Sequence, residues 1–441
     1  MSSYERLGNE ALTKLKTFLS RRALLRAGAG VGLAATVGQT QRGRARAAQD
    51  AICGGEEIKL TYGFWDDAQR PAIEQQIAAF TQLHPNVSIE PQVVPWDDYW
   101  TKLQTGVAGG SSNDVFWINA ASLPVYASQG ALVSIQPMVD DGSIDAEAYP
   151  ESLRSLYTFD GTVYGIPRDF DTIALFYNKG LFDAAGVEHP TADWTWDDLR
   201  AAAEKLTTAD GSQWGYASSL GGQQNYYNLI KQNEGEILNA DQTESMLGEP
   251  AACEALQFSG DFIADGLSPS VAVMQANDPH EMLFPAGVIA MIFGGSWNSL
   301  TFSQSGQDIG LVPLPKGKTK ASAIHGLANV IWSGSQNQCA AMEWVKYLAS
   351  ADAERILGST GTVIPAMEGL QEEWVASLPN LDLKVFVDAV DYSFPVPNPL
   401  SGQEWSDDVD ATLIEAWSGG IPRDEVCAKV NDAANAALKA G

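Results

Sequence analysis

The chain has 441 residues, of which 27 are Lys or Arg and 55 are Asp or Glu, so its formal net charge is −28 at pH 7. An acidic surface of this strength repels phosphate backbones, which excludes nucleic acid as a partner, and it also repels anionic lipid head groups. A chain of this length exceeds what a single hydrophobic core serves and therefore predicts two domains.

The first 48 residues form a segment of their own, with nine basic and two acidic residues, so the rest of the chain has a net charge of −35. Ser20–Leu25 reads SRRALL and resembles a twin-arginine export motif. An apolar stretch at 23–37, too short to span a bilayer, and an A-x-A-like cleavage site at Ala45–Ala47 follow. We expect 1–48 to be a twin-arginine-type signal peptide; the alternative is a basic amphipathic helix that stays attached.

Strands and helices alternate from Ile58 onward. β-Branched and aromatic residues predict strands over 58–65, 86–94 and 114–118, and apolar residues at helical spacing predict helices over 71–83 and 99–107. A strand–helix–strand series of this kind predicts a parallel sheet with helices on its faces. The predicted fold class is therefore α/β.

The segment 159–187 is the most informative part of the chain. A turn at Asp160-Gly161 precedes an extended Tyr164–Pro167, a connector with one Arg and two Asp follows at 168–171, and Ile173–Tyr177 suits a buried strand. A charged connector between two buried strands is a natural place for a hinge and for ligand contacts.

These motifs resemble those of the bacterial family 1 extracellular solute-binding proteins, the sugar-capturing components of ABC importers, of which maltose-binding protein is the familiar member. The resemblance rests on the combination of Tyr164–Pro167 (YGIP), Tyr177–Lys179 (YNK) and Trp194–Leu199 (WTWDDL), and it extends from about Ile58 to the C-terminus. It implies a periplasmic-binding-protein type II-like fold, with two α/β lobes, three interlobe crossovers and a central cleft.

The resemblance also implies that each lobe is built from separated parts of the chain. The N-terminal lobe would take 56–168 and 322–363, and the C-terminal lobe 172–318 and 367–441, with further crossovers near 317–320 and 361–365. Apolar patterns predict additional strands over 173–177, 214–217, 287–293, 308–314 and 328–332, and helices over 196–206, 253–265, 340–349, 382–390, 405–417 and 423–438. The ligand is expected between the lobes, at the carboxyl ends of the parallel strands.

The four cysteines lack the spacing of a zinc site, so we expect no metal. With the lobes divided as the resemblance implies, Cys53 would pair with Cys339 and Cys253 with Cys427, although four cysteines allow three connectivities and buried free thiols are an equal alternative. Cys53 also lies near the expected start of the mature chain, where lipoproteins carry a modified cysteine, so a lipid anchor at Cys53 is a further alternative.

Trp-Asp-Asp occurs three times in the sequence. The triplets that begin at Trp96 and Trp196 are interpreted as helix starts, because acidic residues in a first turn are favoured by the helix dipole. In the third triplet, Trp65, Asp66 and Asp67 end a strand whose carboxyl end points at the cleft, so we expect them to contact ligand.

Trp297 is the strongest single candidate for ligand binding. It follows a buried strand and Gly294-Gly295, where the backbone can approach a ligand closely, and the segment resembles the family's turn that carries a stacking aromatic residue. An indole ring offers a flat apolar face to a pyranose. Glu404 and Trp405 come next, since they lie where the family often has a helix start that faces the cleft.

The remaining candidates lie at the end of the third strand and in the first crossover. They are Trp117 and Asn119, and Arg168 and Asp169, whose polar groups suit sugar hydroxyls. The alternative for Trp117 is a core position, and for Arg168 and Asp169 it is a mutual surface ion pair. Weaker candidates are Tyr226, Tyr227 and His325.

The sequence favours a binding protein that has no catalytic residue and no cofactor, because the serine elbow, zinc-peptidase, P-loop and dinucleotide fingerprints are all absent. We expect the monomeric, periplasmic or cell-surface component of an ABC importer, which captures a carbohydrate by hinge closure and delivers it to a membrane permease. The alternatives are a polyol, a glycerol phosphodiester or iron as ligand on the same fold, and a secreted glycoside hydrolase.

Overall fold

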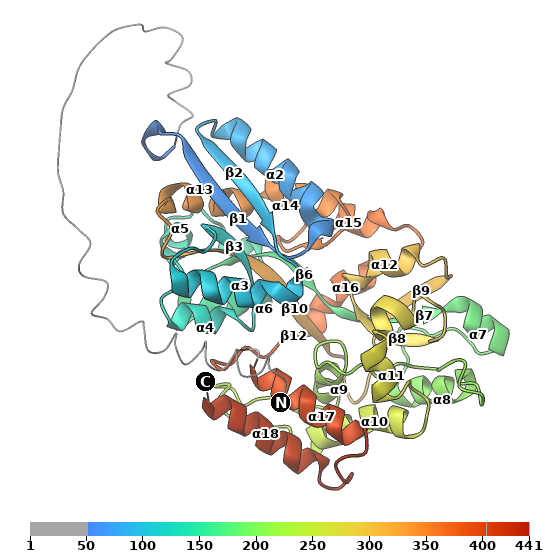
Figure 1. Ribbon diagram of the computed structural model, residues 1–441. Helices are drawn as coiled ribbons and strands as arrows, with labels where there is room; N and C mark the ends of the chain where they lie inside the picture. Colours follow the sequence, from blue (N-terminus) through green and yellow to red (C-terminus); the bar gives the residue numbers. More distant parts are fainter. Residues whose placement is uncertain (1–51, 403, 441) are drawn as a thin grey trace, which may run out of the picture.

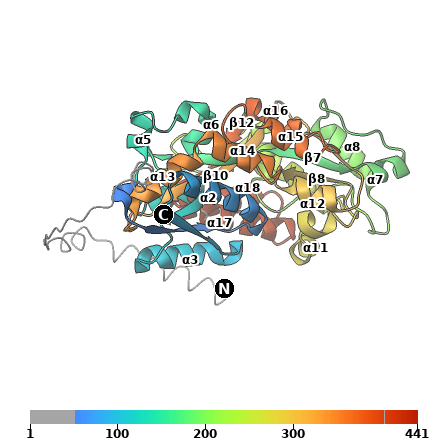
Figure 2. The ribbon, with the colours of Figure 1, turned by 90° about the horizontal axis from the view of Figure 1, so that it is seen from above.

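The computed structural model describes residues 52–402 and 404–440, so the expected signal peptide at 1–48 lies outside the described residues. Figure 1 shows two α/β bodies, one built mainly from the first third of the chain and the other mainly from its middle and C-terminal parts. Seen from above, the two bodies lie next to each other along the long axis of the molecule (Figure 2). Within the described ranges, no helix is both long and apolar enough to cross a membrane.

The larger sheet has seven strands in the order β11-β6-β10-β3-β1-β2, and β12 pairs with β10. Its strands are β1 (Ile58–Phe64), β2 (Val87–Val93), β3 (Val115–Asn119), β6 (Ile166–Asp171), β10 (Ser322–Ile331), β11 (Ile364–Pro365) and β12 (Ser393–Pro395). β1 is parallel to β2 and β3, as the strand–helix–strand series predicts, whereas β10 runs antiparallel to both β3 and β6. A strand from the last third of the chain therefore fills the middle of the sheet.

The smaller sheet is antiparallel and has the order β8-β7-β9. Its strands are β7 (Ile173–Asn178), β8 (Met291–Gly295) and β9 (Ile309–Pro313), and a hairpin of β4 (Thr158–Phe159) and β5 (Thr162–Val163) stands apart. β8 begins later than predicted because Gly287 has a φ of +74°, which keeps the chain in a turn before the strand. The predicted strand at 214–217 makes only isolated bridges to Ile289 and Ile292.

Helices cover both sheets. Those of the larger-sheet body are α2 (Arg70–Leu83), α3 (Trp96–Gly109), α4 (Leu123–Ser128), α5 (Gln136–Asp140), α6 (Glu151–Arg154), α13 (Gln338–Leu348) and α14 (Ala351–Ser359). The others are α7 (Lys179–Ala185), α8 (Trp196–Leu206), α9 (Tyr226–Gln232), α10 (Pro250–Ala264), α11 (Val271–Ala276), α12 (Asn298–Gln304), α15 (Glu372–Ser377), α16 (Lys384–Asp388), α17 (Glu404–Trp417) and α18 (Val426–Ala440). α17 packs against α18 and α10, below the smaller sheet in Figure 1.

Helix starts follow the local sequence. α8 begins at Trp196 with a capping box, in which the Thr195 side chain accepts from the Asp198 amide and the Asp198 carboxylate accepts from the Thr195 amide. The second predicted triplet start, at Trp96, also opens a helix, with Pro95 at the N-cap position. The helix predicted over 340–349 forms as α13, and its Trp344 is fully buried.

The chain passes from the larger sheet to the smaller at the β6–β7 junction, where only Thr172 separates the two strands. Arg168 and Asp169 form an ion pair there, and their side chains are 4% and 1% exposed. Asp169 Oδ1 also accepts from the amide of Leu327 on β10, at 2.9 Å, and the Arg168 guanidinium lies 4.2 Å from the ring centroid of Trp117. Burial raises the pKa of Asp169, and the Arg168 charge opposes that rise.

Two further carboxyls lie near this pair. Glu354 on α14 is buried, and its Oε2 accepts from the amide of Ala366 just after β11, at 3.0 Å. Asp171 accepts from Ser296 Oγ at 2.5 Å. Burial raises the pKa of Glu354 well above its usual range, and burial together with the charge of Asp169 raises the pKa of Asp171 to about 7. The positive charge of Arg168 thus acts on three carboxyls, those of Asp169, Asp171 and Glu354, and opposes the rise of each pKa.

Two disulfides join distant parts of the chain, Cys53 to Cys339 and Cys253 to Cys427, with sequence separations of 286 and 174 residues. This is the pairing expected from the resemblance, and the alternative of buried free thiols is wrong. A sulfur in a disulfide cannot at the same time carry a thioether-linked lipid, so the expectation of a lipid anchor at Cys53 is corrected. The first bond ties the segment before β1 to α13, and the second ties α10 to α18.

Replacing Cys53 and Cys339 by Ser is expected to lower the free energy of unfolding by about 2–4 kcal/mol, because the closed loop restricts the unfolded chain. Urea unfolding followed by tryptophan fluorescence measures the change, and Cys253→Ser/Cys427→Ser is the matched control for the other pair. Unchanged unfolding midpoints on reduction of the wild-type protein would show that neither bond stabilises the fold.

Arg168→Met is expected to cost about 3–5 kcal/mol of stability, because it leaves the buried Asp169 carboxylate without its cation. The double variant Arg168→Met/Asp169→Asn should regain part of this loss, since the amide carries no charge and its oxygen can still accept from the Leu327 amide. Thermal and urea unfolding of the three proteins give the comparison, and a double variant less stable than Arg168→Met contradicts it.

Asp171 gives stability a definite pH dependence. Its folded pKa of about 7 lies above the unfolded value near 3.8, so between these values the folded state binds more protons and its stability falls as pH rises. We expect Asp171→Asn to flatten this slope, by on the order of 1 kcal/mol between about pH 5 and pH 8. Urea unfolding at both pH values tests it, and an unaltered slope in the variant assigns the dependence to other groups.

Candidate ligand-binding cleft

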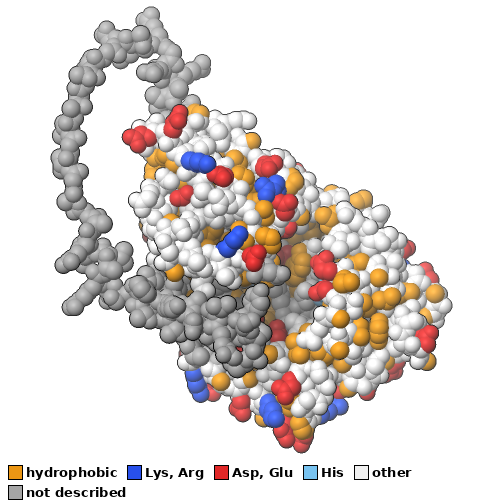
Figure 3. Space-filling model, in the orientation of Figure 1, with side chains coloured by type: hydrophobic (Ala, Val, Ile, Leu, Met, Phe, Trp, Pro, Cys, Tyr) orange, Lys and Arg blue, Asp and Glu red, His pale blue; other side chains and the backbone are white. Residues whose placement is uncertain are grey.

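A cavity of about 570 Å³ opens between the two bodies. Figure 3 shows the surface hollowed where the bodies meet. This volume lies within the range of small-molecule sites in proteins. The larger-sheet body supplies residues from the start of α3, the end of β3 and the middle of β10, and the opposite wall comes from the loop before α9, from α9 itself, from 274–280 and from α17.

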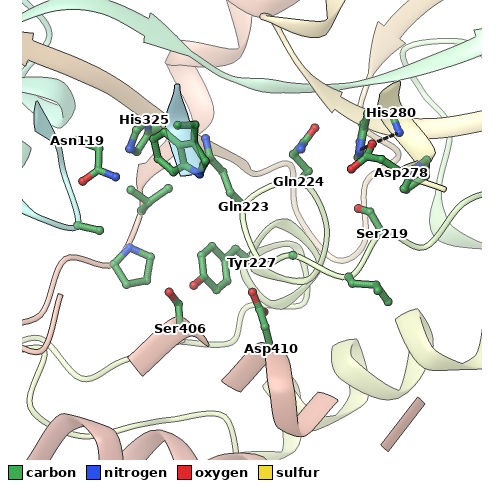
Figure 4. Close-up of a pocket in the computed structure, with 18 of the residues that line it drawn as sticks. Asn119, Ser219, Gln223, Gln224, Tyr227, Asp278, His280, His325, Ser406 and Asp410 are labelled. Carbon is green, nitrogen blue, oxygen red and sulfur yellow. Dashed lines mark hydrogen bonds and ion pairs between the residues drawn. The ribbon is translucent and has the colours of Figure 1, made fainter. Parts of the chain in front are cut away.

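The wall that the larger-sheet body supplies presents polar groups from two neighbouring strands, β3 and β10. Asn119 ends β3, is 5% exposed, and uses its Oδ1 to accept from the amide of Ser122 at 2.9 Å. His325 lies on β10, and burial lowers its pKa to about 4, so the imidazole is neutral at physiological pH. Figure 4 shows Asn119 and His325 on the same side of the cavity. The indole of Trp96 extends this wall at the mouth and is 47% exposed.

The loop 219–224 supplies a continuous part of the opposite wall. The Ser219 hydroxyl and the Gln223 amide nitrogen are buried and have no hydrogen-bond partner. A buried donor without a partner costs about 1–3 kcal/mol, so unpaired groups that line a cavity indicate where a polar ligand binds. Gln224 Oε1 is already engaged and accepts from the amide of Gly295 at 3.4 Å. The Ser219 hydroxyl and the Gln223 amide nitrogen thus keep unused hydrogen-bonding capacity beside the cavity.

An aromatic pair forms part of the floor. The rings of Tyr227 on α9 and Trp405 on α17 are nearly parallel, with an interplanar angle of 11° and centroids 6.2 Å apart. Gly222 permits this arrangement, because a Cβ at that position would lie 2.4 Å from the Tyr227 ring. Both side chains are almost fully buried and still border the cavity, which gives it an apolar surface beside its polar wall.

Two carboxyls border the cavity, Asp278 and Asp410. Asp278 Oδ1 accepts from the amides of His280 and Glu281, both at 2.8 Å, and so caps the short π-helix at 279–283. Asp410 Oδ1 accepts from Tyr226 OH at 2.7 Å, and burial raises its pKa to about 7. Figure 4 shows Asp410 rising from α17 below Tyr227, and Asp278 beside His280 at the other end.

His280 is held as a neutral donor. Its Nε2 lies 2.8 Å from the Phe293 carbonyl, which can only accept, so Nε2 carries the proton. Burial lowers the pKa of His280. Among the described residues, no group of three or more His, Cys, Asp and Glu side chains could hold a metal ion. The described lining thus offers amides, hydroxyls, neutral imidazoles, two carboxyls and aromatic rings.

The family model for bacterial extracellular solute-binding proteins matches residues 66–355. The chain belongs to this family. A solute-binding protein of Listeria monocytogenes, solved in complex with cycloalternan, superposes with a TM-score of 0.81 and 26% identity, over 87% of this chain and 100% of that one. The galactooligosaccharide-binding protein of Bacillus subtilis is 25% identical over 85% of this chain and 89% of its own length. The diacetylchitobiose-binding protein of Streptomyces coelicolor is 25% identical over 78% and 81%.

The fold of this solute-binding protein is the periplasmic-binding-protein type II fold that the resemblance implies, with two α/β lobes and a cleft between them. Of the ten residues predicted to contact ligand, the structure brings Asn119 and Trp405 to the cavity. The weaker candidates Tyr227 and His325 also line it, whereas Tyr226 lies behind Tyr227 and reaches Asp410.

Several of the residues predicted to contact ligand lie away from the cavity. Trp117 is fully buried, and its Nε1 donates to Tyr62 OH at 2.6 Å, so its alternative as a core residue is correct. Arg168 and Asp169 do pair with each other, but inside the junction rather than on the surface, because β6 is covered on both sides. Neither of these two residues lines the cavity.

The Trp65 triplet supports the lobe instead of lining the cavity. The Trp65 ring packs edge-on against Trp96, Tyr99 and Trp117, at 4.9–5.2 Å between centroids. Asp66 accepts from the amide of Ala68 and caps the turn that follows, and Asp67 pairs with Arg70 at 2.6 Å. The two carboxylates that follow β1 therefore interact with the next turn of the chain and not with the cavity.

Trp297 and Glu404 are exposed but lie outside the lining of the cavity. Trp297 is 36% exposed and rests on Gly295, where a Cβ would lie 2.0 Å from the indole. Glu404 is in the first turn of α17, one residue before the lining residue Trp405. Three lining residues, Ser219, Gln223 and Asp410, were not predicted from the sequence. The glycines and glutamines of the loop 219–224 were a signal that could have indicated the first two.

Proposed function

We propose that this solute-binding protein is the extracytoplasmic component of an ABC importer and captures a carbohydrate, most suitably an oligosaccharide, in the cavity between its lobes. The observation that carries the proposal is that two kinds of surface border the same cavity. Ser219 Oγ and Gln223 Nε2 are polar atoms without a hydrogen-bond partner, and the rings of Tyr227 and Trp405 form an aromatic floor. Sugars present hydroxyls at their edges and C–H groups on their faces, which matches a wall of this kind. The relatives named for oligosaccharides support the same class of ligand.

Capture proceeds by closure of the two lobes. In this proposal the N-terminal lobe consists of 56–168 and 322–363 and the C-terminal lobe of 172–318 and 367–441, so the chain crosses between them three times. Ligand bound to the loop 219–224 and α17 would be met by Asn119 and His325 from the other lobe, and short crossovers would absorb the rotation. A membrane permease then recognises the closed, monomeric protein, which uses no cofactor.

Membership of an extracellular family implies export. We assign that export to the twin-arginine-type segment at 1–48, with the mature protein in the periplasm or at the cell surface. A strongly acidic mature chain agrees with a protein that works outside the cytoplasm without binding nucleic acid.

The lining argues against two of the alternatives. A glycerol phosphodiester would need cationic partners, and the described lining contains neither Lys nor Arg. In a glycoside hydrolase two carboxyls flank one bond, whereas Asp278 Oδ1 is engaged in capping the helix at 279–283, which leaves Asp410 as the other carboxyl of the described lining. Release of reducing sugar from oligosaccharides by the purified protein would establish the hydrolase instead.

Gln223→Ala is expected to weaken binding of the best oligosaccharide from a thermal-shift panel by about tenfold or more, because it removes a buried donor that has no partner in the free protein. Titration calorimetry measures the dissociation constants. Trp297→Ala is the matched control and should stay within about threefold of wild type, since Trp297 lies outside the cavity. If only Trp297→Ala weakens binding, the ligand binds elsewhere than in this cavity. If no saccharide binds, the ligand is not a carbohydrate.

A further inference from the structure

Asp410 is a cavity carboxyl that has no cationic partner within the part of the chain that the structure describes. Among the described residues, Tyr226 OH donates to its Oδ1 at 2.7 Å, and no Lys, Arg or His forms an ion pair with it. Buried carboxylates in proteins are normally paired with a cation or bound to metal. At Asp410 the neutral phenol satisfies one lone pair of Oδ1, and the second oxygen is left for whatever enters the cavity (Figure 4).

The other groups around Asp410 do not supply the missing charge. Tyr226 and Tyr227 face it from α9, and Asp407 lies one turn earlier on its own helix. The pKa values of both tyrosines are raised by burial, so both stay neutral, and the charge of Asp407 opposes ionisation of Asp410. A positive charge brought by a ligand would therefore be stabilised by Asp410 without competition from a resident cation.

The described lining of the cavity holds two carboxyls and neither Lys nor Arg. Its two imidazoles, His280 and His325, have lowered pKa values and are neutral, and Asp278 is a second carboxyl in the lining. Tyr227 and Trp405 add aromatic rings next to Asp410, and such rings attract cations as well as sugar C–H groups. Carboxylate, aromatic rings and an acidic surrounding protein together favour a ligand that bears a protonated nitrogen.

We propose that Asp410 binds a protonated amine of the ligand, so that the cavity prefers a basic saccharide, such as an amino sugar oligomer, to a neutral saccharide of the same size and linkage. This rests on the proposed function and narrows its ligand class. Asp410 is a specificity-determining residue that touches the ligand amine, while Ser219, Gln223 and the aromatic floor bind parts common to charged and neutral sugars.

The experiment compares three disaccharides that share one β-1,4-linked skeleton: cellobiose with a hydroxyl at C2, chitobiose with a protonated amine, and diacetylchitobiose with a neutral acetamide. Their trisaccharides form a second series. Titration calorimetry is expected to give chitobiose about tenfold tighter binding than either neutral sugar, because a charge-assisted hydrogen bond is roughly twice as strong as a neutral one. Added salt should weaken chitobiose binding more than cellobiose binding.

Asp410→Asn removes the charge and keeps an oxygen that can accept from Tyr226. It is expected to abolish the preference by weakening chitobiose binding, and Asp408→Asn, which removes an exposed carboxylate of the same helix outside the lining of the cavity, is the matched control that should retain the preference. Because the pKa of Asp410 is about 7, protonation at lower pH should reduce the preference in the wild-type protein and leave the Asn variant unaffected. Unfolding midpoints confirm that both variants fold.

The outcomes separate this proposal from the one it rests on. If a neutral saccharide binds and its amine counterpart binds no better, or if Asp410→Asn keeps the preference, the basic ligand class is overturned and the carbohydrate function stands. If no saccharide binds in either series or in the wider panel, both proposals fall.

Discussion

The ion pair between Arg168 and Asp169 is the constraint on which both lobes depend. It lies where β6 runs into β7, and a carboxylate buried to this extent is tolerated only with a cation and good hydrogen bonds around it. Asp169 is bonded to the amide of Leu327 on β10, and Glu354 is bonded to the amide of Ala366 after β11. Polar bonds near the lobe junction therefore tie β6 to β10, and α14 to the segment after β11.

The polar residues at the lobe junction and those at the cavity differ in what they contact. At the junction, charges are paired inside the protein and the aromatic ring of Trp117 covers the guanidinium, so these groups are not available to a ligand. In the cavity, amide and hydroxyl groups of Ser219 and Gln223 are buried but unpaired. Arg168 Nη2 at the junction also lacks a partner, so it is the position beside the cavity, and not the missing hydrogen bond alone, that makes Ser219 and Gln223 candidates for ligand contact.

Local pattern predicted most of the elements and could not predict how distant elements meet. The strand–helix–strand series up to Asn119 and the capping box at Thr195 are encoded within a few residues, and both appear in the structure as expected. The antiparallel insertion of β10 between β3 and β6 depends on contacts more than 150 residues apart, for which no local signal exists. The disulfide pairing was accessible only through the resemblance to a family.

The site was predicted in part for the same reason. Asn119, predicted from its position at a strand end, does line the cavity, but Trp117, two residues earlier, is buried on a strand that is covered on both faces. For Trp65–Asp67 the capping of a turn competes with ligand contact, and the local interaction is the one formed. Asp410 lies inside a helix among other acidic residues, and nothing in its spacing distinguishes it from its exposed neighbours; only packing of α17 against α9 sets it apart.

The central place of β10 in the larger sheet has a consequence for biosynthesis. β1, β2, β3 and β6 leave the ribosome first, yet β3 and β6 are joined only through a strand that ends at Ile331. Until then both strands present unpaired edges, which are templates for association with other nascent chains. The larger sheet therefore cannot close until the chain has been made as far as Ile331, although its first strands come from the N-terminal part of the chain.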